Sequence, residues 1–135
     1  MKGLNAPALC LIASLGTTVQ AADRTEIKVM MTQLTGKNCS SQLKQNNTIL
    51  PGDCITYRIF VENIGNQTAH FVEIAALIPE HTELHSTFRK LSNHQNLGSV
   101  MERSASGQRL IKTTLDTLPA NKSGKVVLEY SVKVI

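Results

Sequence analysis

The sequence has few aromatic residues and no cluster of positive charge. Among its 135 residues there is no tryptophan, and there are only two tyrosines and three phenylalanines. The 14 Lys and Arg residues are scattered, they face 10 Asp and Glu residues, and the formal net charge is +4. Nucleic-acid-binding domains usually carry a basic stripe or patch. The composition therefore gives no support for nucleic-acid binding.

No uninterrupted apolar run is long enough to span a bilayer, which takes about 20 residues. The nearest candidate, residues 4–22, is interrupted by Pro7 and by several polar residues. Lys2, a short apolar centre over residues 8–15 and compact residues before Ala21 follow the order of a secretory signal. We therefore expect residues 1–21 to be a signal peptide cleaved near Ala21, residues 22–135 to form a single domain, and the product to be periplasmic or secreted.

Helical periodicity is absent as well, and the dominant apolar period is two. Ile55, Tyr57, Ile59 and Val61 alternate with more polar residues, as in a strand with one buried face. In the first strand we expect Val29 and Met31 on the apolar face. Seven strands are predicted, over residues 26–34, 54–62, 69–78, 83–89, 97–102, 109–115 and 126–134. Short strands separated by Gly, Pro and Asn turns predict an all-β, immunoglobulin-like Greek-key sandwich.

Cysteine is scarce, with three residues in the chain. Removal of the signal peptide would remove Cys10 and leave Cys39 and Cys54. An even pair in an exported domain predicts a disulfide, and the alternative is two free thiols. For a loop of this size the chain-entropy model gives a stabilisation of about 3 kcal/mol.

Three short stretches carry a family resemblance. Residues 50–53 read Leu-Pro-Gly-Asp, residues 55–59 Ile-Thr-Tyr-Arg-Ile, and residues 61–66 Val-Glu-Asn-Ile-Gly-Asn. Together they resemble the signature of the conserved repeat domain of bacterial envelope proteins, also called domain of unknown function eleven. The resemblance continues to residue 135 and implies an immunoglobulin-like envelope module. An aspartate common in that family is Ala76 here, so no role of that acid carries over.

The matched residues have physical roles in specifying the fold. Gly52 and Gly65 permit unusual backbone conformations, and Asp53 and Asn63 can hydrogen-bond to their own turns. Tyr57 is expected to pack its ring in the core, where its hydroxyl needs a partner. The complete predicted set is Pro51, Gly52, Asp53, Tyr57, Asn63, Gly65, Asn66 and Pro79.

One short segment could bind a metal ion. In an extended chain His81, Glu83 and His85 share a face, and such ligands suit zinc or copper. The alternative is an ordinary cluster of surface side chains. Residues 104–107 do not form a nucleophile elbow, and no carboxylate pair has an informative context. We therefore predict no enzymatic activity, no cofactor and no tightly bound small molecule.

The function predicted from these features is that of an exported envelope module with a structural, adhesive or protein-interaction role. Its partner would be another envelope protein or a cell-surface component. The alternatives are a periplasmic metal-binding protein and an assembly factor for surface fibres. Because only Ile135 and no polar tail follows the last predicted strand, a further hypothesis makes residues 132–135 an exposed sheet edge that pairs with the partner.

Overall fold

The computed structural model describes residues 23–45 and 48–135, so the predicted signal peptide lies outside the described part. The elements are β1 (Ile27–Gly36), a 3-10 helix (Lys37–Cys39), β2 (Leu43–Lys44), β3 (Cys54–Asn63), β4 (Ala69–Ile78), β5 (Thr82–Lys90), β6 (Val100–Arg103), β7 (Arg109–Leu118) and β8 (Lys125–Val134). The predicted all-β class is confirmed, and all seven predicted segments contain a strand. The two-residue strand β2 was not predicted.

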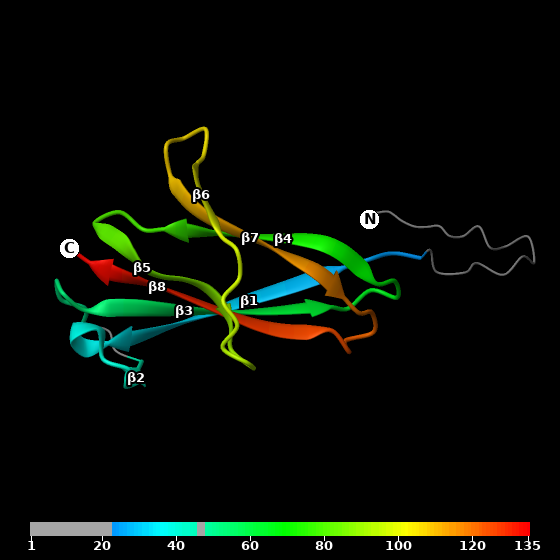
Figure 1. Ribbon diagram of the computed structural model, residues 1–135, viewed down its shortest axis with the longest axis horizontal. Coiled ribbons are helices and arrows are strands. Elements are labelled where there is room, and N and C mark those ends of the chain that lie inside the picture. Colours follow the sequence, from blue (N-terminus) through cyan, green and yellow to red (C-terminus); the bar gives the residue numbers. More distant parts are fainter. Residues whose placement is uncertain (1–22, 46–47) are drawn as a thin grey trace, which may run out of the picture.

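The strands form two antiparallel sheets (Figure 1). One sheet has five strands in the order β2-β1-β3-β8-β5, and the other has three in the order β4-β7-β6. The immunoglobulin-like Greek-key order is not confirmed. In an immunoglobulin domain the last strand lies in the sheet opposite the first, whereas β8 lies in the same sheet as β1.

The core lies between the two sheets and is built by the predicted alternation. The apolar faces of β3 and of its neighbour β8 are buried against the inner faces of β4 and β7 in the other sheet. Tyr57 stacks on Tyr130 with ring centroids 5.0 Å apart, and Phe88 meets Tyr130 edge-on at 5.2 Å. The Tyr130 hydroxyl donates to the carbonyl oxygen of Leu77 at 2.8 Å, which ties the two sheets together.

The apolar face of β1 departs from the prediction. Val29 pairs with Val61 and Met31 pairs with Ile59, so both side chains lie on the inner side of the sheet. They are nevertheless 52% and 58% exposed. Both side chains therefore lie on the predicted apolar face, but that face is not buried, because the three-stranded sheet leaves β1 uncovered.

The last strand is not an edge. β8 is paired along one side with β3 and along the other with β5, and both pairings include Lys133. The hypothesis that residues 132–135 recruit a partner strand is therefore wrong, because the backbone groups of this strand already have partners within the sheet.

The turn before β3 is held by Asp53. Its carboxylate accepts hydrogen bonds from the backbone N–H groups of Asn38 (2.9 Å) and Leu50 (3.0 Å), and it pairs with the Lys37 ammonium at 3.4 Å. These backbone hydrogen bonds and the Lys37 charge outweigh desolvation and lower the pKa of Asp53. Pro51 and Gly52 occupy the centre of the turn, and the φ of Gly52 is +94°. Pro followed by a residue with positive φ is the type II pattern.

The turn after β3 is organised by Asn63, whose side chain is fully buried. Its amide nitrogen donates to the carbonyl oxygens of Gln67 and Leu118, each at 2.9 Å, and its oxygen accepts from the N–H of Gly65 at 3.0 Å. Gly65 is required for a different reason than predicted: a Cβ there would lie 2.5 Å from the carbonyl oxygen of Arg24.

The remaining predicted turn residues also hold neighbouring segments. The side-chain oxygen of Asn66 accepts from the N–H of Arg24 at 2.8 Å. The carbonyl oxygen of Pro79 accepts from the Thr82 hydroxyl at 2.7 Å and from the Arg109 guanidinium at 2.8 Å. Asn66 therefore fixes the chain before β1, and Pro79 fixes the connection between the sheets.

Replacing Asn63 tests this organisation. Asn63→Ala leaves the carbonyl groups of Gln67 and Leu118 without their side-chain donor, so we expect the free energy of unfolding to fall by at least about 2 kcal/mol. The control is Asn93→Ala, which removes an exposed asparagine and should change the free energy of unfolding by less than about 0.5 kcal/mol. Urea denaturation measures both, and equal losses would contradict the role of Asn63.

Candidate functional site

The free edge of β1 is the main candidate surface. β2 pairs with β1 only at Thr35 and Gly36, so over the described residues the stretch Ile27–Leu34 has a strand partner on one side only, which is β3. We call this stretch the free edge. Alternate N–H and C=O groups of an unpaired strand point outward and can hydrogen-bond to an added strand.

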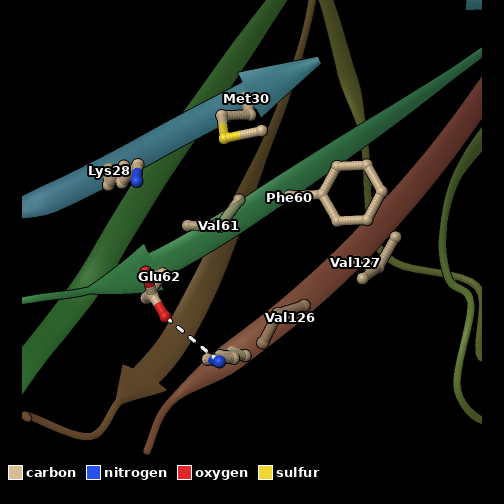
Figure 2. Close-up of a pocket in the computed structure, with 8 residues that line it drawn as sticks. Lys28, Met30, Phe60, Val61, Glu62, Val126 and Val127 are labelled. Atoms are coloured by element: carbon tan, nitrogen blue, oxygen red, sulfur yellow. Dashed lines mark ion pairs between the residues drawn. The ribbon is translucent and has the colours of Figure 1, made fainter. Parts of the chain in front are cut away.

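An apolar row flanks the free edge on the outer face of the five-stranded sheet. Met30 is paired with Phe60, and Phe60 with Val127, so three side chains from neighbouring strands lie in line (Figure 2). Met30 is 54% and Phe60 39% exposed. This outer row borders a shallow cavity of about 250 Å³.

A groove flanks the free edge on the inner side. Its volume is about 440 Å³, and it is lined from β1 by Val29 and Met31 and from β4 by residues that include Ala75 and Leu77. Tyr57, Ile59 and Tyr130 also line it. β4 pairs only with β7 among the described strands, so the groove lies between two sheet edges. We call it the inner groove.

Charged rows border the outer row on both sides. On one side Lys28 is paired with Glu62, and Glu62 contacts Lys125 at 3.4 Å (Figure 2). On the other side the buried Glu129 carboxylate pairs with Arg58 at 3.0 Å and with Arg89 at 2.7 Å. Each row has one more positive than negative charge, so an approaching segment meets an apolar strip between two weakly positive strips.

The pKa of Glu129 follows from these contacts. Burial would raise it, but hydrogen bonds and charge from Arg89 and Arg58 outweigh burial and hold it below the usual value of 4.5. The ionised carboxylate is therefore the form that the folded protein prefers at neutral pH.

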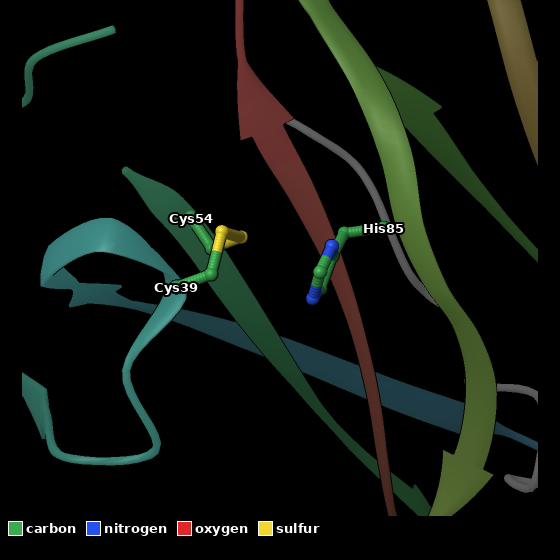
Figure 3. A group of neighbouring side chains, drawn as sticks. All are labelled: Cys39, Cys54 and His85. Carbon is green, nitrogen blue, oxygen red and sulfur yellow. A yellow bond between two sulfur atoms is a disulfide. The ribbon is translucent and has the colours of Figure 1, made fainter. Parts of the chain in front are cut away.

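The predicted disulfide between Cys39 and Cys54 is present, with Cα atoms 4.6 Å apart. The His85 side chain extends from β5 toward the two sulfur atoms (Figure 3). The sulfur atoms and an imidazole nitrogen all lie within 4.8 Å of one another. In the described part of the chain this is the one group of three cysteine, histidine or acidic side chains close enough to share a metal ion.

The site predicted from His81, Glu83 and His85 is not assembled in the structure. It required an extended backbone from residue 81 to 85, but His81 precedes β5 with a φ of +63°. Glu83 lies opposite Lys133. Of the three predicted ligands, only His85 belongs to the group around the sulfur atoms.

Sequence reasoning missed the outer row and the inner groove. Met30, Phe60 and Val127 occupy the positions that strand alternation assigns to the polar face. Their apolar character was the available signal, because several apolar residues that lie together on an otherwise polar face form a patch of the kind that marks a contact surface.

No known protein family, curated protein or solved structure matches the chain. No helix within residues 23–45 and 48–135 has the length and apolar character to cross a membrane. The resemblance to the conserved repeat domain therefore stays a prediction.

The ion pairs of Glu129 predict a specific pH dependence. Because folding lowers its pKa, Glu129 stabilises the protein above its unfolded-state pKa, and this stabilisation is lost as the pH falls through the folded-state value. Glu129→Gln should lower the melting temperature at pH 7, and the difference from wild type should shrink as the pH is lowered from about 5 to 3. Glu102→Gln, which breaks an exposed pair with Lys112, is the control. Thermal unfolding that shows a constant difference at all pH values would contradict the prediction.

Proposed function

We propose that this protein is an exported, non-enzymatic module of the bacterial cell envelope, with a structural, adhesive or protein-interaction role. Its partner, another envelope protein or a cell-surface component, binds as an extended segment along the free edge of β1. The observation that carries this proposal is that, among the described residues, Ile27–Leu34 of β1 has no strand partner on one side and carries exposed apolar side chains on both faces.

The two faces together favour a strand as the bound element. Side chains of an added strand alternate between the faces of the sheet. One set would lie beside Met30 on the outer face, and the other would enter the inner groove beside Val29 and Met31. A strand therefore covers both apolar surfaces at once, while its backbone pairs with the free edge.

The charges add a chemical preference. The rows on either side of Met30 each carry a net positive charge. A bound segment with apolar residues at its centre and an acidic residue opposite Lys28 complements this pattern, since opposite charges across strands stabilise pairing.

The disulfide and the sequence both support the proposed location in the cell envelope. A disulfide persists in oxidising compartments such as the periplasm or the cell exterior. The predicted signal peptide and the resemblance to the conserved repeat domain agree with an envelope location.

Site-specific photo-crosslinking in the producing cells tests the proposal. A photoreactive residue replaces Gln33, an exposed position on the free edge, and we expect a discrete crosslinked adduct. Adding Met31→Lys should reduce that adduct at least tenfold, because a charge on an edge strand opposes strand pairing.

The matched control is Val100→Lys on β6. Val100 is 59% exposed and Met31 58% exposed, so the two substitutions place the same charge at equally exposed sites. Val100→Lys should leave the adduct unchanged. Equal effects of the two substitutions, or an equally strong adduct from a photoreactive residue at Thr114 on β7, would show that the free edge is not the binding surface.

A further inference from the structure

We propose that Cys39, Cys54 and His85 form a metal site that the disulfide keeps closed and that reduction opens to Zn²⁺ or Cu⁺. This inference does not depend on the proposed partner binding. It rests on the convergence of two sulfur atoms and one imidazole nitrogen within 4.8 Å (Figure 3).

An irregularity in β5 brings His85 to this group. Leu84 is paired with Val132 and Ser86 with Ser131, so two residues advance along β5 while one advances along β8. His85 is the extra residue of this β-bulge. Bulges re-aim side chains and are over-represented beside functional sites.

The loop that holds Cys39 has anchors other than the disulfide. The Asp53 carboxylate, 2% exposed, binds the N–H of Asn38 and the ammonium of Lys37, the two residues before Cys39. Cys54 is fixed by its place in β3, between β1 and β8. Both sulfur atoms are therefore expected to stay close to His85 when the bond between them is reduced.

The spacing and ligand types suit a soft or borderline metal ion. Ligand atoms around one zinc ion lie about 3.5–4 Å apart, given Zn–S bonds of about 2.3 Å and Zn–N bonds of about 2.0 Å. In the structure the two sulfur atoms and the imidazole nitrogen lie within 4.8 Å of one another, so rotation of these side chains is enough to bring them to the spacing of zinc ligands. Two thiolates and an imidazole also suit Cu⁺. The three ligands border a polar pocket of about 560 Å³, so a water molecule can enter and occupy the fourth coordination position of the metal ion.

Reduction of the Cys39–Cys54 disulfide needs a reductant, and we propose that an external dithiol supplies the electrons. The dithiol gives two electrons and two protons to the disulfide, so the Cys39–Cys54 bond breaks, two thiols form, and the dithiol becomes a disulfide. Binding of Zn²⁺ then releases both thiol protons, and the two thiolates balance the charge of the ion.

Titration with Zn²⁺ tests the proposal in full-length protein carrying Cys10→Ser, which removes the third thiol. After reduction under anaerobic conditions, one Zn²⁺ should bind per chain, as measured against a chromophoric chelator. His85→Ala should weaken binding at least tenfold, whereas His81→Ala should leave it unchanged. Co²⁺ in place of Zn²⁺ should show thiolate-to-metal absorption that Cys39→Ser abolishes.

Three results would overturn the proposal. One is equal Zn²⁺ binding by the oxidised and the reduced protein. If that binding were then lost in both His81→Ala and His85→Ala, the metal site would be the one first predicted from the sequence. Another is unchanged affinity in reduced His85→Ala. The last is loss of the β-sheet circular dichroism signal on reduction without recovery on adding Zn²⁺, because the three ligands then do not converge.

Discussion

Between the Cys54–Lys133 pair and the Glu62–Lys125 pair, β3 and β8 form one continuous antiparallel ladder, and the other parts of the domain are attached to it. Tyr57 and Tyr130 stack across this ladder on the inner face, and the Tyr130 hydroxyl reaches the second sheet at Leu77. On the outer face the same ladder carries Glu129 with its two arginines. β1 and β5 then pair along its two sides. Pairing distant strands in this way costs loop-closure entropy. The disulfide joins the segment after β1 to the start of β3, so it reduces that cost for the β1–β3 pair.

The two sheets are unequal, and the candidate binding surface follows from that difference. A five-stranded sheet packed on a three-stranded one cannot have all of its inner face covered. The uncovered strand is β1, whose inner side chains Val29 and Met31 remain exposed although they point toward the core side. Single exposed apolar residues are ordinary. Here they flank a strand edge that has no partner among the described residues, which is the combination that strand addition uses.

Alternation of residues predicted which side of each strand is apolar, but it could not predict what lies opposite. The buried face of β3 was predicted from its period of two, since side chains alternate locally. The exposure of β1 and the position of β8 between β3 and β5 depend on strand order, which is set by contacts distant in sequence. The same limit applies to the sites. The disulfide followed from cysteine count and the predicted compartment, whereas the link between His85 and the sulfur atoms depends on a bulge that leaves no pattern in the sequence.

The residues that carry the family resemblance hold β1 at both ends. Before the strand, Asn63 and Asn66 bind the backbone of Glu26 and Arg24, and Gly65 permits the close approach of that segment. After the strand, Asp53 and the disulfide fix the 3-10 helix into which β1 leads. The stretch between these anchors therefore stays extended and paired with β3 on one side, while over Ile27–Leu34 its other side has no strand partner in the described part of the chain. A segment that binds there orders only its own backbone, and such pre-organisation strengthens binding by lowering the conformational cost. These turn residues, which specify the fold, thereby also hold the free edge in the extended form that the proposed partner would bind.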